Sequence, residues 1–307
     1  MGYLFLAVAI FFGVAKGFFG KKTGNFVDSI NTSILVSMIR LAFCVVLGAI
    51  MLMPQFLQDG ICILRISSEV LWNTFISGIA NAAILVLWLL IIRQGALVLI
   101  DIFGLIGALV PLIYSNFFFA EPLRINHWIG FVLLAFSVWL LCSYNNSVKP
   151  KITVKVAILL ILFALVCGAG DLSQKIFVMQ TNGSVSTSVF NFYTYIFACI
   201  FLGGYYLFLK LFLKRKAAGS EAASQNPISK KVLLYIVLMA ACLYLNLLFK
   251  TVSANYMDAA NIYPMYQGAL MIANCIAAAI FFKERINYKS ICGIILGIAA
   301  LCMINLL

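Results

Sequence analysis

The chain contains ten long apolar segments, most of them close to the roughly 20 residues that a helix needs to cross a bilayer. Lipid offers no hydrogen-bonding partner to a peptide group, so each of these segments must form a helix. The predicted fold class is an all-α integral membrane protein with ten transmembrane helices. We place the helices at about 3–19, 31–53, 70–92, 95–118, 126–144, 153–177, 185–209, 231–253, 258–282 and 288–307.

The composition excludes a soluble globular domain, because 64% of the residues are hydrophobic and only 10% are charged. The net charge of +12 comes from basic residues that mostly lie between the apolar segments. There they serve membrane topology and contact anionic headgroups, so the expected partner is the lipid bilayer and not nucleic acid. No Cys/His spacing indicates a metal and no phosphate-binding loop is present, so we expect no cofactor. The first apolar segment lacks a basic leader and is interpreted as a retained helix in a multi-pass protein of the cell (inner or plasma) membrane.

A charged turn occurs twice, after the fourth and the ninth segments. Glu121 heads FFFAEPLRINHWIG and Glu284 heads FFKERINYKSICG, at a constant offset of 163 residues. This duplication predicts two five-helix repeats, residues 1–148 and 149–307. Five spans is an odd number, so the second repeat enters the membrane with the opposite orientation to the first. We interpret both glutamates as structural residues of turns at the membrane surface, with Arg124 or Arg285 nearby.

The basic residues predict an orientation. Sixteen of the 21 fall in the odd-numbered connections or beside them, four fall on the other side, and Arg40 lies within the second segment. Cytoplasmic loops carry an excess of Lys and Arg, so this count places the odd-numbered loops in the cytoplasm and both termini outside.

Further short motifs lie along the chain. A glycine followed by lysine occurs early in both halves, as Gly13 before Lys21 and Lys22 and Gly168 before Lys175, and single motifs are Arg40 in SMIRLAF, Pro111 in GALVPLIY and IYPMYQG at 262–268. Together with the two glutamate turns, these motifs make the chain resemble the drug/metabolite transporter superfamily, EamA type. It implies a ten-helix secondary transporter with both termini in the cytoplasm. The charge count implies the reverse, so the orientation stays open.

The predicted function is secondary-active transport of a small metabolite or amino-acid-like solute by alternating access. Export is what the resemblance implies, while uptake stays open, as does the choice between coupling to a proton through Asp101 or Asp171 and exchange of solutes. The chain is expected to act as a monomer or a homodimer and not as an enzyme. Two alternatives stay open, an integral-membrane enzyme and a lipid-binding membrane protein that does not transport.

Ionisable groups within the spans are the first candidates for a solute site, because they are costly in hydrocarbon unless they face a cavity or a partner. Asp101 either binds a cationic solute or a proton, or pairs with Arg93 near the interface. Asp171 and Lys175 lie one helical turn apart and can pair with each other. Lys250 either faces a cavity or extends its amine to the interface.

Polar and aromatic residues at helical spacing complete the predicted site. On the ninth helix, Tyr263, Gln267 and Asn274 form such a polar stripe. Pro264 frees a backbone carbonyl there, and we expect a local unwinding of the helix around it. Gly13 with Gly17, and Gly293 with Gly297, are expected to mark close helix packing. The full set of candidate solute-binding residues is Asn81, Trp88, Asp101, Asp171, Lys175, Asn191, Tyr193, Asn246, Lys250, Tyr263, Tyr266, Gln267 and Asn274.

Overall fold

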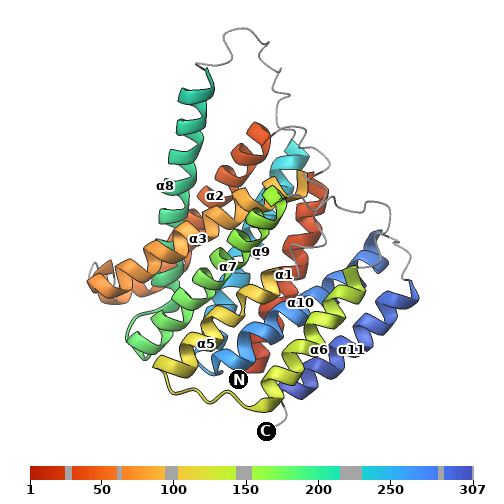
Figure 1. Ribbon diagram of the computed structural model, residues 1–307. Coiled ribbons are helices and arrows are strands. Elements are labelled where there is room, and N and C mark those ends of the chain that lie inside the picture. The colour runs from red at the N-terminus through yellow and green to blue at the C-terminus, as the bar shows by residue number, and fades with distance from the viewer. Residues whose placement is uncertain are drawn as a thin grey trace.

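The computed structural model describes residues 1–24, 30–60, 64–93, 103–142, 154–214, 230–282 and 287–305, and these residues form a helical bundle (Figure 1). Ten helices are labelled, and both termini lie at the same end of the bundle. The helices are α1 (Gly2–Gly24), α2 (Ile30–Asp59), α3 (Ser68–Arg93), α5 (Leu109–Phe118), α6 (Ile125–Cys142), α7 (Val154–Thr181), α8 (Thr187–Lys214), α9 (Lys230–Ala254), α10 (Ala259–Phe282) and α11 (Tyr288–Asn305).

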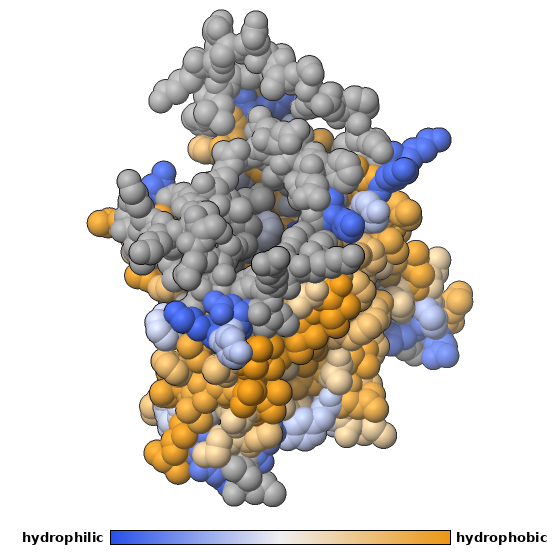
Figure 2. Space-filling model, turned by 90° about the vertical axis from the view of Figure 1, so that its right-hand side faces the viewer, coloured by the Kyte–Doolittle hydropathy of each residue, from blue (hydrophilic) through white to orange (hydrophobic). Residues whose placement is uncertain are grey.

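Within the described residues, eight helices are long and apolar enough to cross a membrane, and Phe103–Phe118 and Ile125–Leu141 are shorter apolar helices. Large apolar side chains such as Phe11, Trp139 and Ile295 point outward, as lipid contact requires. Figure 2 shows the resulting belt of hydrophobic surface on one face, with hydrophilic residues above and below it. The prediction of an all-α integral membrane protein is confirmed.

The two halves of the chain interlock through pairs of helices. The first helix of each half packs on the third helix of the other, so that α1 contacts α9 and α3 contacts α7. The second helices, α2 and α8, also pack together, and the last helices, α6 and α11, lie side by side (Figure 1). This pattern is unchanged when the halves are exchanged, as expected of a duplicated chain.

A break in the fourth predicted span coincides with a close helix crossing. Helical turns at 103–107 and α5 are separated at Ala108. Pro111 has no N–H to donate to the Gly107 carbonyl four residues earlier. A Cβ atom built on Gly168 of α7 would lie 2.7 Å from that carbonyl oxygen. Glycine at position 168 is therefore required for the approach of α7.

The helix bounds agree with the predicted ones, apart from the ends of some helices and the expected unwinding inside the ninth helix. α1 continues beyond the predicted end at residue 19 to Gly24, so Lys22 lies within the helix. Lys16, which the charge count groups with the first loop, lies inside both the predicted span and α1. α2 runs through Pro54 to Asp59, into the predicted connection. The predicted unwinding at Pro264 is wrong, because α10 is continuous there. Proline at this position removes only the bond to the Ala260 carbonyl, one turn into the helix.

The expected glycine contacts are present at both pairs. A Cβ atom on Gly13 would lie 2.6 Å from Leu270, and one on Gly297 would lie 2.6 Å from the Ser137 hydroxyl. Both glycines therefore sit where two helices touch.

Candidate functional site

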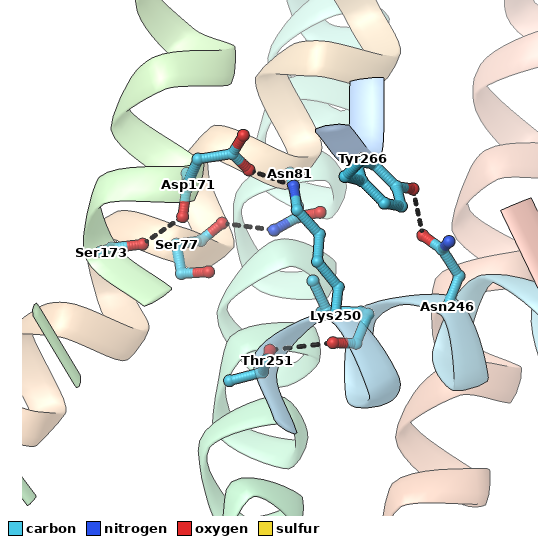
Figure 3. A network of polar contacts seen from close by, with 10 residues as sticks. Ser77, Asn81, Asp171, Ser173, Asn246, Lys250, Thr251 and Tyr266 are labelled. Atoms are coloured by element: carbon cyan, nitrogen blue, oxygen red, sulfur yellow. Dashed lines mark hydrogen bonds and ion pairs between the residues drawn. The ribbon is translucent and has the colours of Figure 1, made fainter. Parts of the chain in front are cut away.

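Asp171 and Lys250 form an ion pair inside the bundle. Lys250 Nζ of α9 lies 2.5 Å from Asp171 Oδ1 of α7, and the two side chains are 9% and 22% exposed (Figure 3). Asn81 of α3 lies beside this pair in Figure 3, and its amide donates to the Ser77 carbonyl at 2.8 Å. Three helices from both halves of the chain therefore meet at one charged group.

Aromatic rings of α10 cover the Lys250 amine. The nitrogen lies 4.4 Å from the ring centroid of Tyr266 and 5.3 Å from that of Tyr263, within cation–π range. Tyr266 OH donates to Asn246 Oδ1 at 2.9 Å, and Asn246 Nδ2 donates to the Ala9 carbonyl at 2.6 Å. These bonds connect α10, α9 and α1, and they keep the Tyr266 ring against the amine.

A second ion pair lies nearer the end of the bundle where both termini are found. After α5 the chain turns at Ala120, whose φ of 53° is left-handed, and the Ser115 carbonyl accepts the Glu121 N–H. This turn directs the Glu121 carboxylate inward, where it forms an ion pair with Lys175 of α7. Glu121 Oε2 also accepts the Ala259 N–H at 2.7 Å, at the start of α10, where a helix favours negative charge.

Lys175 completes this contact by donating to the Met257 carbonyl at 3.2 Å. Glu121 and Lys175 are both buried, Met257 lies in the α9–α10 connection, and Ala259 is the first residue of α10. We call Glu121, Lys175, Met257 and Ala259 the terminus-side seal. It joins α7, α10 and the α5–α6 connection beneath the Asp171–Lys250 pair.

Comparison with known proteins identifies the type of bundle. The model of the EamA-like transporter family matches residues 154–306. The chain belongs to the EamA-like transporter family. It is therefore a multi-pass membrane transporter, as the repeated motifs predicted.

A solved structure, described only as a crystal structure of a protein, has the same fold as this transporter. It matches at a TM-score of 0.70 and 12% sequence identity, over 99% of this chain and 96% of that one. At this identity the likeness concerns the fold alone. No curated protein matches the transporter sequence.

The predicted pairing of Asp171 with Lys175 is wrong. Although the two residues lie one turn apart on α7, each pairs with a residue of another segment, Asp171 with Lys250 and Lys175 with Glu121. Arg124, the partner expected for Glu121, is exposed. Lys250 is buried in an ion pair and does not extend to the interface.

The remaining candidates of the transporter fall into different surroundings. Tyr263 and Asn191 are buried, and Tyr263 OH and both side-chain polar atoms of Asn191 have no hydrogen-bond partner within the described part of the chain. Gln267 Nε2 lies 2.8 Å from the Cβ position of Gly104, beside the break in the fourth span. Asn274 is exposed, although its side-chain oxygen approaches Gly17 of α1.

Three candidates lie apart from this group or outside the description. Trp88 is 41% exposed on α3. Tyr193 OH donates to the Leu64 carbonyl at 3.0 Å and so holds the connection before α3. Asp101 lies outside the described residues, as does Glu284.

Two basic residues, Lys16 and Arg40, were missed as site candidates. Arg40 is 6% exposed on α2, and Lys16 is partly buried on α1. The same signal marks both residues, a charge within a predicted apolar segment, although the charge count groups Lys16 with the first loop. Among the described residues, no group of three or more His, Cys, Asp or Glu side chains gathers as a metal site would require.

Proposed function

We propose that this transporter is a secondary-active exporter of a small metabolite or amino-acid-like solute, working by alternating access. The Asp171–Lys250 ion pair, with Tyr266 stacked on its amine, carries this proposal. Charged and aromatic groups that are buried together within apolar spans are expensive to keep, and transporters place them where a solute binds. The solute site would therefore lie among α1, α3, α7, α9 and α10.

The terminus-side seal supports a state in which the site is closed toward the termini. Its contacts are ionic and involve main-chain groups at helix ends, so water can replace them when the halves move apart. The Asn73 amide also donates to Gln180 at 2.7 Å, and the rings of Phe177 and Phe190 stack with their centroids 4.3 Å apart. In alternating access these contacts would break together as the opposite side closes.

The exchangeable pattern of helix pairs supports two inverted repeats, residues 1–148 and 149–307, as the moving units. Coupling to a proton would use Asp171, because protonation of its carboxyl group removes the charge that holds Lys250. Exchange of one solute for another would leave the pair ionised throughout. Saturable uptake that does not depend on a proton gradient would favour exchange.

Counterflow in proteoliposomes tests the transport proposal. Purified protein is reconstituted with an internal excess of one compound, and entry of the labelled compound is followed for amino acids, nucleobases, polyamines and quaternary amines. We expect saturable counterflow of at least one class, reduced by at least about tenfold in Asp171→Asn, Lys250→Met and Gln267→Ala.

Trp88→Phe is the matched control, because Trp88 is exposed outside this cluster. It should transport at the wild-type rate in the same liposomes. Wild-type flux in all three site variants would disprove the proposed location, and the absence of saturable counterflow for every class would count against transport by this chain.

A further inference from the structure

Arg40 presents an unoccupied guanidinium edge inside the bundle. The side chain is 6% exposed, and its Nε and Nη2 atoms have no hydrogen-bond partner among the described residues. Its Nη1 atom lies 3.7 Å from the Met239 sulfur of α9, and a thioether is a weak acceptor without charge. Nε and Nη2 together form one side of the planar fork that binds a carboxylate or phosphate through two parallel hydrogen bonds.

Lys16 of α1 faces the same region. Lys16, Gly20 and Thr23 follow each other at spacings of four and three residues, so they share one face of α1. The Thr23 hydroxyl lies 3.9 Å from the Met239 sulfur, and the Cβ position of Gly20 lies 3.3 Å from the Met239 methyl group. Met239 is therefore a common neighbour of Arg40 and of the α1 face that carries Lys16.

The charges around this region are unbalanced. The basic residues within the apolar spans that are not exposed are Lys16, Arg40, Lys175 and Lys250. Glu121 neutralises Lys175 and Asp171 neutralises Lys250, while Lys16 and Arg40 have no carboxylate partner in the described ranges. Arg40 and Lys250 both repel the charge of Lys16. An unpaired charge in surroundings of low polarity destabilises the protein, so these two charges favour the binding of an anion.

We propose that Arg40 and Lys16 bind the carboxylate or phosphate group of the transported solute. This proposal rests on the proposed transport function and gives its solute class, compounds that carry a carboxylate or phosphate group. Met239, Asn246 and Lys250 occupy one face of α9 at spacings of seven and four residues, so the anion site lies about 16 Å along the helix from the Asp171–Lys250 pair. The rest of the solute extends from Arg40 toward Asn246 and Tyr266.

Thermal unfolding of the purified full-length protein tests this assignment. The probes are inorganic phosphate, benzoate, uncharged benzamide and cationic benzylamine, at equal ionic strength. We expect phosphate or benzoate to raise the Tm of the wild type, and benzamide and benzylamine to leave it unchanged. Arg40→Gln and Lys16→Gln should weaken the apparent affinity for the anion by about 10- to 100-fold.

Two further variants separate charge from geometry. Arg40→Lys keeps the charge but loses the planar fork, so it should bind the anion more weakly than the wild type and more tightly than Arg40→Gln. Lys155→Gln removes an exposed lysine at the start of α7 and should bind the anion like the wild type. If benzylamine or benzamide stabilises the wild type as well as benzoate does, or if neither anion acts, the proposal is overturned.

The ligand-free protein gives an independent readout. Arg40→Gln removes an unpaired buried charge, so the Tm of this variant without ligand should equal or exceed that of the wild type. The Tm of the double variant Arg40→Gln/Asp101→Asn tests whether Asp101 is the counter-charge of Arg40. A lower Tm in Arg40→Gln, with no additional loss on adding Asp101→Asn, would mean that Arg40 pairs within the protein and would overturn the proposal.

Nanodiscs with and without phosphatidylglycerol distinguish a solute from a lipid headgroup. Stabilisation by free phosphate or benzoate in neutral-lipid discs supports a solute site, whereas stabilisation only by phosphatidylglycerol overturns it. Counterflow separates this proposal from the transport function. Saturable flux only of solutes that carry neither a carboxylate nor a phosphate would overturn the anion assignment and leave the transport function supported. Absence of flux with intact anion binding would contradict transport and leave the anion assignment supported.

Discussion

Asp171 of α7 and Lys250 of α9 form an ion pair at 2.5 Å inside the membrane-spanning bundle. The pair joins α7 and α9, which α8 separates in the sequence, and the Tyr266 ring of α10 stacks on the Lys250 amine. Removing either charge leaves the other in surroundings of low polarity, so the pair contributes to the stability of the bundle.

Lys250→Met should therefore reduce the free energy of unfolding by about 3 kcal/mol, at the low end of the range for buried pairs because Asp171 is 22% exposed. The double variant Asp171→Asn/Lys250→Met removes both charges and should lose less than Lys250→Met alone. Equilibrium unfolding of the four proteins in the mutant cycle measures this coupling. Strictly additive losses would show that the two side chains do not interact.

Glu121→Gln should destabilise the protein by about 3 kcal/mol. The amide can still accept the Ala259 N–H, but Lys175 loses its negative partner while it stays buried. The measurement is thermal unfolding, with Glu69→Gln as the matched control because Glu69 is exposed in the first turn of α3. The control should change the free energy of unfolding by less than about 0.5 kcal/mol. Equal effects of the two substitutions would contradict the structural role of Glu121.

Tyr266→Phe removes the hydrogen bond to Asn246 but keeps the ring over Lys250. We expect a loss of about 0.6 kcal/mol, the average for such bonds within a membrane protein. Tyr266→Leu also removes the cation–π contact and should cost about 1 kcal/mol more. Unfolding of the two variants side by side checks this order, and a smaller loss for Tyr266→Leu would exclude a role of the ring.

Gly168→Ala should destabilise the transporter by about 1 to 3 kcal/mol, because its methyl group would lie 2.5 Å from Val110 and 2.7 Å from the Gly107 carbonyl oxygen. Gly204 lies in a helix interior with nothing within 4 Å of its Cβ position. Gly204→Ala should raise stability by up to about 1 kcal/mol through helix propensity alone. The Tm values of the two variants should thus move in opposite directions, and a shared direction would mean that the crossing of α5 and α7 is not tight.

Much of the fold was predictable because the bilayer imposes strong local rules. The apolar segments from 70 to 92 and from 231 to 253 correspond closely to α3 and α9, since a run of this length in lipid has no alternative to a helix. The helix ends were less predictable. α1 extends past Gly20 to Gly24 because charged residues such as Lys22 are tolerated where a helix leaves the hydrocarbon region.

The candidate site was predictable only in part. Asn246, Lys250 and Tyr266 were found because polar residues at helical spacing in an apolar segment have few explanations other than an interior surface. Trp88 follows Asn81 by seven residues, about two helical turns, but is 41% exposed. Periodicity assigns residues to a helix face, and it does not say whether that face meets a neighbour or lipid.

The length and apolarity of each segment are local properties, so the amino-acid sequence alone predicts a ten-helix membrane protein with a repeated turn motif. The pairing of the charges is visible only in the three-dimensional arrangement of the helices. Asp171 is one turn from Lys175, yet it pairs with Lys250, and Lys175 pairs with Glu121, which had looked like a surface residue. Ion pairing depends on which helices lie side by side, and in a bundle that proximity is set by packing among all the helices and not by the spacing within one of them.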